Sequence, residues 1–246
     1  MHGMTKAEVD AIERNELRPQ GGPKRPRDAA TLILLDRTAN DFRVLMGRRH
    51  ARHAFMPGKF VFPGGRTDPG DSRVEVAAPL PTAVEEKLIA GPGRASAARA
   101  RAIALSAIRE TYEEAGLLIG QKGEFRTSKP EWQGFAEHGV QPSLEAVRFV
   151  ARAITPPGRV RRYDTRFLVA WRSDVAVELA DGGPTNELED LVWLPLAEAR
   201  NGDIPGITKT ILEELELRLE QDPLLQPGGP VPFYRMIGNR FIREVL

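Results

Sequence analysis

The stretch SAARARAIALSAIRETYEEAGL, from Ser96 to Leu117, is the most informative part of this 246-residue sequence. Its first half is rich in alanine and arginine, which favour helices, and Ser96 and Gly116 suit the two ends of a helix. Small and apolar residues recur at steps of three and four and predict one stripe: Ala100, Ile103, Ala104, Ala107, Ile108, Thr111 and Ala115. We predict a helix over residues 96–115.

Three glutamates, Glu110, Glu113 and Glu114, stand at the end of this helix. Their spacing puts the carboxylates on one flank, where like charges repel and the helix dipole disfavours anions. A hard divalent cation such as Mg²⁺ resolves this conflict, because it prefers carboxylate oxygens. The alternative is a solvated acidic face on which Arg109 pairs with Glu113.

A glycine-rich turn lies upstream, in the stretch FPGGRTDPGD from Phe62 to Asp71. Adjacent glycines let the backbone approach a ligand closely. Turn and helix together resemble the Nudix box, G-x5-E-x7-R-E-U-x-E-E-x-G-U, where U is bulky and apolar. The matching residues are Gly65, Arg109, Glu110, Glu113, Glu114, Gly116 and Leu117.

The chain departs from the box in three ways. Asp71 stands for the first glutamate, and Thr111 stands for an apolar residue. Between Asp71 and Arg109 lie 37 residues where the box has seven. The metal-binding half is intact, so the insertion bears on the substrate class more than on metal binding.

The resemblance implies a metal-dependent site with Mg²⁺ or Mn²⁺. Glu113 and Glu114 would bind the metal with the Gly65 carbonyl, and Arg109 would orient the cluster. Glu110 would bind metal or position water. Glu187, six residues before Trp193, is the candidate general base or further metal ligand, and its alternative is a capping or surface glutamate.

Basic residues near the turn are candidate phosphate contacts, because guanidinium and ammonium groups bind phosphate oxygens. A solvated loop is the alternative for each of them. The candidates are Arg48, Arg49, Lys59 and Arg66.

Elsewhere the apolar patterns predict a mixed α/β domain, in agreement with the Nudix-type α/β/α sandwich with a mixed sheet that the resemblance implies. We expect strands at residues 29–36, 42–48, 59–62, 117–120, 150–154, 163–171, 175–179 and 191–194, and near the C-terminus. We expect helical segments at residues 82–90, 129–137, 143–149, 196–201 and 207–220. Residues 1–26 read as an extension, 27–246 as the Nudix domain, 72–95 as an insertion in the box, and 207–246 as a C-terminal helix and tail.

The long insertion, FPGG and the segment Ile154-Thr155-Pro156 … Arg162-Tyr163-Asp164-Thr165-Arg166-Phe167 resemble the Nudix branch that includes peroxisomal coenzyme A diphosphatases. A motif typical of CoA-specific members is matched in part, at Leu45, Arg49, Gly58 and 62–65. The resemblance implies hydrolysis of a nucleoside diphosphate linked to another group, with CoA or acyl-CoA leading. The alternatives are an ADP-ribose, NADH or MutT-like pyrophosphatase and a non-catalytic nucleotide sensor.

The composition indicates which partners and which kinds of site are expected. The net charge of +1 gives no reason to expect nucleic-acid binding, and no cysteine is present for a disulfide, thiol nucleophile or Cys-based zinc site. No apolar run is long enough to span a bilayer. We expect a cytoplasmic protein with a small-molecule partner and no nucleic-acid or membrane partner, and we leave room for a homodimer.

Overall fold

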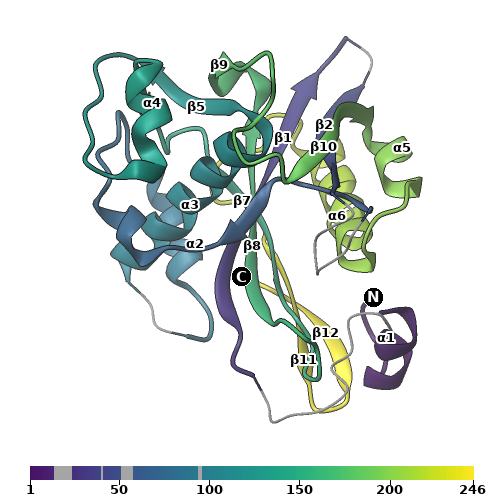
Figure 1. Ribbon diagram of the computed structural model, residues 1–246. Helices are drawn as coiled ribbons and strands as arrows, with labels where there is room; N and C mark the ends of the chain where they lie inside the picture. The colour runs from purple at the N-terminus through teal and green to yellow at the C-terminus, as the bar shows by residue number, and fades with distance from the viewer. Residues whose placement is uncertain (14–23, 40, 51–57, 94–95) are drawn as a thin grey trace.

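The computed structural model describes residues 1–13, 24–39, 41–50, 58–93 and 96–246. A large mixed sheet runs through the molecule, with helices on both of its faces (Figure 1). The predicted α/β/α sandwich is therefore confirmed. Parts of the predicted extension, insertion and basic loop before residue 58 lie outside the described residues.

Most predicted elements are present. The helices are α1 (Lys6–Ile12), α2 (Thr82–Ile89), α3 (Ala97–Ala115), α4 (Gln133–Glu137), α5 (Leu196–Asn201) and α6 (Gly206–Gln221). Short 3-10 turns are η2 (Pro69–Arg73), η3 (Pro130–Trp132) and η4 (Arg172–Asp174). The strands are β1 (Arg27–Arg37), β2 (Phe42–Arg49), β3 (Phe60–Val61), β4 (Gly64–Arg66), β5 (Leu117–Lys122), β6 (Val140–Pro142), β7 (Arg148–Ile154), β8 (Tyr163–Trp171), β9 (Val175–Glu178), β10 (Leu188–Pro195), β11 (Pro232–Ile237) and β12 (Arg240–Val245).

The main sheet has the order β10-β2-β1-β8-β7-β11-β12, with β3 beside β2 and β4 beside β1. Strands β1 and β8 run parallel from Arg27 opposite Tyr163 to Leu35 opposite Trp171, whereas β7 and β8 are antiparallel. A smaller sheet has the order β6-β5-β9. Strand β4, which belongs to the glycine-rich turn, pairs with β1, so the turn lies beside the long β1–β8 pairing.

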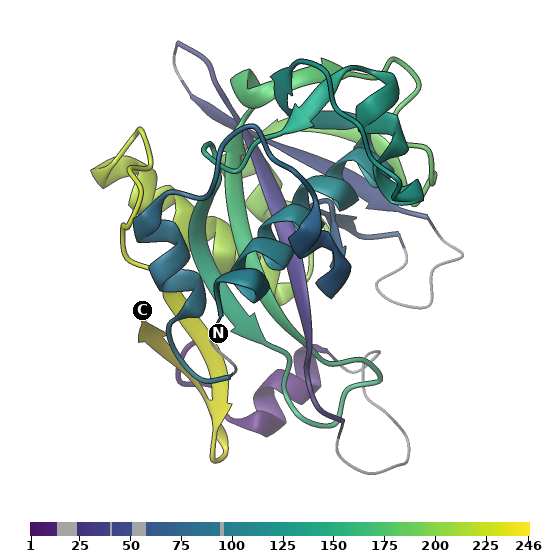
Figure 2. The same cartoon turned by 90° about the vertical axis from the view of Figure 1, so that its left-hand side faces the viewer.

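Alternation along the central strands explains the two layers of helices. Leu32 and Leu34 of β1 belong to a core cluster with α3, whereas Ile33 and Leu35 belong to a second cluster with α6. Successive side chains of a strand point to opposite faces, so an unbroken apolar run indicates a strand covered on both sides. Figure 2 shows α3 crossing one face of the central strands, with α6 behind them.

Helix α3 begins and ends as the sequence predicts. The Ser96 side chain accepts a hydrogen bond from the Arg99 amide at 3.1 Å, and Gly116 has the left-handed conformation with φ of 71°. All seven residues of the predicted stripe are buried. The small side chains let the helix pack closely on β1 and the turn before it.

The prediction of a helical segment over residues 143–149 is wrong. Only a short turn forms there, closed by the Val147 amide and the Leu144 carbonyl at 3.1 Å. Arg148 then begins β7 by pairing with Val169 of β8. Pairing with the central strand overrides the helix-like spacing of the apolar residues.

Both ends of the chain pack together at one end of the main sheet. The Gly3 amide donates to the Phe241 carbonyl, and the Lys6 amide donates to the Asn239 carbonyl. Helix α1 therefore lies beside the β11–β12 hairpin (Figure 1). In the described part of the chain, no helix combines the length and the apolar character needed to cross a membrane.

Asp28 ties β1 to two arginines from different layers. Its carboxylate accepts hydrogen bonds from Arg99 of α3, with Nε at 2.7 Å, and from Arg166 of β8, with Nη1 at 2.8 Å. Burial favours the neutral acid, but the Arg99 hydrogen bond and the charges of Arg166 and Arg99 outweigh it and lower the pKa of Asp28.

We predict that Asp28→Asn lowers the free energy of unfolding by about 2 kcal/mol at pH 7. Because the folded-state pKa is depressed, this stabilisation is present above the unfolded-state pKa and is lost as pH falls through the folded one. Urea unfolding at pH 7 and pH 3 measures both values. The exposed Asp181→Asn is the matched control, and an undiminished gap between Asp28→Asn and wild type at pH 3 contradicts this assignment.

Candidate active site

A pocket of about 380 Å³ opens where the glycine turn, the end of α3 and the β1–β8 strands meet. Its lining includes three glutamates: Glu110 and Glu114 of α3, and Glu187 before β10. The sequence predicted all three as site residues, and the fold brings them together from segments more than 70 residues apart.

The two adjacent glycines hold the backbone against these acids. The Gly64 amide donates to Glu114 Oε2 at 3.0 Å. A Cβ atom at Gly65 would lie 2.3 Å from Glu110 Oε2, so a side chain at this position would displace the carboxylate. The glycine pair therefore forms a cradle in which backbone and carboxylates lie in direct contact.

The surroundings of Glu110 and Glu114 raise the pKa values of both carboxyl groups. Burial raises the pKa of Glu110 to about 7, with the Glu113 and Glu187 charges adding to the rise and Arg109 opposing it. Burial also raises the pKa of Glu114 to about 8 against the Gly64 hydrogen bond and the Arg49 charge. Arg49 Nη2 stays 4.0 Å from Glu114 Oε1, too far for a strong charged hydrogen bond. Carboxylates that are costly to ionise in isolation suit a bound cation.

Arg109 lies behind the pocket and binds three carboxylates at once. Its Nε contacts Asp71 at 3.1 Å, Nη2 contacts Glu110 at 2.9 Å, and Nη1 contacts Glu113 at 2.7 Å. The Arg109 side chain is 9% exposed, so these ion pairs are shielded from water. Arg109 thereby fixes Glu110 and Glu113 relative to the turn.

Asp71, which stands where the Nudix box has its first glutamate, connects the turn to α3 and to Trp132. It is buried, and besides Arg109 it accepts hydrogen bonds from Ser106 Oγ at 2.9 Å and Trp132 Nε1 at 2.9 Å. The Ser106 oxygen also accepts from the Asp68 amide at 3.0 Å. Both carboxylate oxygens of Asp71 therefore accept hydrogen bonds, and these bonds hold η2 against α3.

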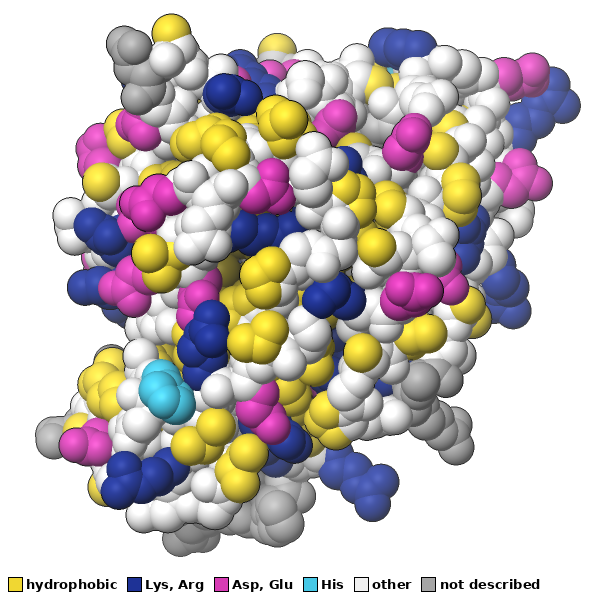
Figure 3. Space-filling model, turned by 180° about the vertical axis from the view of Figure 1, so that it is seen from behind, with side chains coloured by type: hydrophobic (Ala, Val, Ile, Leu, Met, Phe, Trp, Pro, Cys, Tyr) yellow, Lys and Arg dark blue, Asp and Glu magenta, His cyan; other side chains and the backbone are white. Residues whose placement is uncertain are grey.

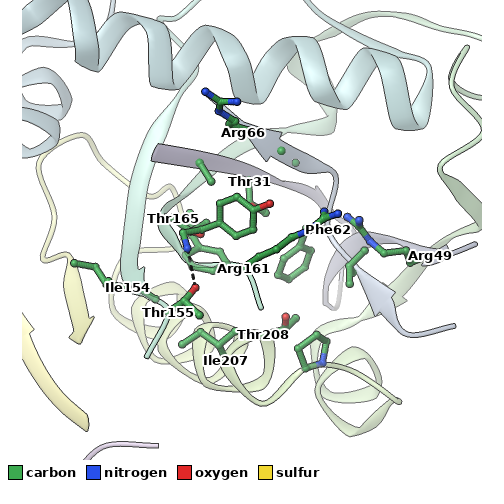
Figure 4. A pocket seen from close by; sticks show the side chains of 18 of the residues that line it. Thr31, Arg49, Phe62, Arg66, Ile154, Thr155, Arg161, Thr165, Ile207 and Thr208 are labelled. Carbon is green, nitrogen blue, oxygen red and sulfur yellow. Dashed lines mark hydrogen bonds between the residues drawn. The ribbon is translucent and has the colours of Figure 1, made fainter. Parts of the chain in front are cut away.

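The remaining predicted residues divide into two groups. Arg49 and Arg66 line the pocket with Gly65, although the Arg66 guanidinium is directed away from the pocket centre in Figure 4. Arg48 and Lys59 are absent from the described lining and pair with Asp190 at 3.1 Å and Asp203 at 2.7 Å. Neighbours in a strand face opposite ways, which explains why Arg49 reaches the pocket and Arg48 does not.

Several residues that line the pocket are not among the site residues predicted from the sequence. Ile154, Thr155, Pro156, Arg161, Tyr163 and Thr165 come from β7, β8 and the loop that joins them. Most of them lie in the segment that carries the resemblance to one Nudix branch, but that segment gave no reason to place them beside the acids. Only the pairing of β8 with β1 does so.

No three acidic or histidine residues among those described form a ready-made metal-binding group. Glu113 pairs with Arg109 at 2.7 Å and is not among the described residues that line the pocket. The oxygen donors that line the pocket near the box are the carboxylates of Glu110, Glu114 and Glu187, together with the Gly65 backbone. Oxygen donors of this kind fit Mg²⁺ or Mn²⁺ and not a soft metal.

We predict that Ser106→Ala lowers the free energy of unfolding by about 2 kcal/mol, because it leaves the Asp68 amide without its partner and removes a donor from Asp71. Thr111→Val is the matched control, since the buried Thr111 hydroxyl bonds only to the Ala107 carbonyl of its own helix among the described residues. Chemical denaturation compares the two variants. Equal losses would contradict the role of Ser106 in anchoring the turn.

Comparison with known proteins supports the same reading. No family model matches the chain. A NUDIX hydrolase from Alicyclobacillus acidocaldarius is 25% identical, with a TM-score of 0.60 over 80% of this chain and 96% of that one. The NUDIX domain of Shewanella oneidensis NrtR, solved with ADP ribose, is 14% identical with a TM-score of 0.45 over 88% and 99% of the two chains, a likeness too weak to argue from. The chain therefore shares the fold of a NUDIX hydrolase, and this fold brings Gly65, Glu110 and Glu114, which match the Nudix box, to one pocket.

Proposed function

We propose that the protein is a Mg²⁺- or Mn²⁺-dependent pyrophosphohydrolase of nucleoside diphosphates linked to another group. One observation carries this proposal: Glu110, Glu114 and Glu187 face one pocket beside the Gly64–Gly65 turn. Acidic and basic side chains are interspersed on the face in Figure 3, with no broad basic region among its described residues, in keeping with a small-molecule substrate.

The residues present fit a divalent cation. Glu110 and Glu114, with Glu113 and the Gly65 carbonyl as the box implies, would hold the metal. A bound cation supplies positive charge that offsets a diphosphate and makes water easier to deprotonate. Arg109 keeps the carboxylates in place, and the Gly64 amide fixes Glu114 Oε2.

The other residues bind substrate and move a proton. Arg49 would contact phosphate oxygens, Arg66 would do so by turning its guanidinium toward the pocket, and Glu187 would take the proton from the attacking water. Tyr163 and Ile207 also line the pocket, and they would contact the group beyond the diphosphate.

CoA or acyl-CoA is the leading substrate within this class. The support is the segment around Thr155 and Tyr163, which resembles the CoA diphosphatase branch and lines the pocket. A hydrolysis screen with Mg²⁺ over CoA, ADP-ribose, NADH, dinucleoside polyphosphates and dNTPs tests the choice. Release of 3′,5′-ADP and 4′-phosphopantetheine supports CoA, whereas turnover of ADP-ribose alone rejects it.

We predict that Glu113→Gln and Glu114→Gln each reduce turnover at least about 100-fold, because each removes a negative charge from the proposed metal site. Glu137→Gln, on the exposed end of α4, should leave the rate unchanged. Circular dichroism checks that all three variants are folded. Near-normal rates in Glu113→Gln and Glu114→Gln would refute the metal assignment.

A further inference from the structure

Arg161 is a positively charged residue at the pocket that has no role in the proposed reaction described above. It belongs to the loop between β7 and β8, is exposed, and lines the pocket. In Figure 4 its side chain reaches into the pocket from that loop and points toward Arg49, which comes from β2 on the opposite side. The described part of the chain shows no ion pair or hydrogen bond for the Arg161 guanidinium.

The acids at the pocket do not neutralise this cation. Glu110 is bound by Arg109 at 2.9 Å. Glu13, which also lines the pocket, pairs with Arg159 through one carboxylate oxygen at 2.7 Å. Arg49 is itself poorly satisfied, because its Nε is buried without a hydrogen-bond partner in the described structure. Two guanidinium groups that point toward one another favour a multiply charged anion between them.

The loop that presents Arg161 is rigidly built. The Thr155 amide donates to the Tyr163 carbonyl at 2.9 Å, and the Tyr163 amide donates to Thr155 Oγ1 at 3.0 Å, the bond drawn in Figure 4. Arg162 Nε closes the same loop by donating to the Thr155 carbonyl at 3.0 Å. Because both ends are tied together, Arg161 projects from a loop of defined shape.

Helix α1 fixes the tip of this loop. The Arg159 side chain is fully buried and pairs with Asp10 at 2.6 Å and with Glu13 at 2.7 Å. Met1 and Glu13 also line the pocket, so the N-terminal segment is one of its walls. Arg159 and Arg161 thus have separate tasks: Arg159 anchors the loop on α1, and Arg161 faces the pocket.

We propose that Arg161 and Arg49 together bind a phosphate group of the substrate, and that α1 positions Arg161 through Arg159. That this ligand is a substrate rests on the proposed function. Binding of its phosphate group by the two arginines does not depend on turnover. The phosphate belongs either to the diphosphate or to a separate phosphomonoester of the same molecule.

Calorimetry with inorganic pyrophosphate in the absence of metal tests the site directly. Arg161→Gln weakens binding about tenfold, the expected loss for one charged hydrogen-bonded contact. Arg126→Gln, an exposed arginine that pairs with Glu124, leaves affinity unchanged. Equal affinity in wild type and Arg161→Gln, or no binding by wild type, overturns the proposal. Pyrophosphate binding through Arg161 without hydrolysis of any substrate would remove the proposed function alone.

Kinetics separate the two sources of the phosphate. KM and kcat of Arg161→Gln are measured with CoA and with 3′-dephospho-CoA. With CoA, KM rises about tenfold and kcat stays within about twofold of wild type. A rise for both substrates assigns Arg161 to the diphosphate, and a rise for CoA alone assigns it to the 3′-phosphomonoester. A rise for neither substrate contradicts the proposal.

The role of α1 is tested by Asp10→Asn, which weakens the anchor without altering a pocket residue. It raises KM about threefold in the wild-type background and has no further effect in Arg161→Gln. This non-additivity distinguishes positioning from general destabilisation. An equal effect in both backgrounds would show that α1 acts independently of Arg161 and would overturn that part of the proposal.

Discussion

The ion pairs of Arg109 with Asp71, Glu110 and Glu113 are the interaction on which the rest of the site depends. One buried guanidinium presents its nitrogens to three carboxylates, so its position sets theirs. Removing any partner would leave charge uncompensated in a shielded place, which is far more costly than losing a surface pair. The acids at the pocket are therefore held in register with the glycine turn before any ligand arrives.

This arrangement also explains how the box tolerates 37 residues between Asp71 and Arg109. A long connection adds only slowly to the entropy of closing a loop, provided that its ends are fixed. Ser106 and Trp132 fix one end by bonding to Asp71, and Arg101 of α3 holds the start of the insertion by donating to the Ser72 carbonyl at 2.9 Å. The insertion can then leave and return without moving the site.

The sequence predicts the parts of the fold that local chemistry controls. The capped helix α3, the strand β8 and the helix α5 follow from periodicity and capping residues, and the box spacing points to Glu110, Glu114 and Gly65. What it cannot give are contacts set by pairing across the sheet. The bond from Trp132 to Asp71 joins residues 61 apart, and Arg148 and Phe149, predicted as helical, belong to β7 because they pair with β8.

The same limit applies to the substrate side of the pocket. Arg48 and Arg49 are adjacent arginines that the sequence alone cannot tell apart. Their side chains point to opposite faces of β2, and only Arg49 lines the described pocket. Arg161 has no local signal of function, since its importance arises from a loop closed on Thr155 and anchored through Arg159 on α1. Function here combines a motif that can be read along the chain with a pocket that only the fold assembles.

We propose that the acids beside Gly65 bind a divalent cation. Titration calorimetry with Mg²⁺ on wild type, Gly65→Ala and Gly123→Ala tests it most directly, because a methyl group at Gly65 meets the Glu110 carboxylate whereas one at Gly123 meets open space. The account predicts binding by wild type and Gly123→Ala and about tenfold weaker binding by Gly65→Ala. Equal affinities in all three, or no response of wild type to Mg²⁺ or Mn²⁺ with or without pyrophosphate, would contradict it.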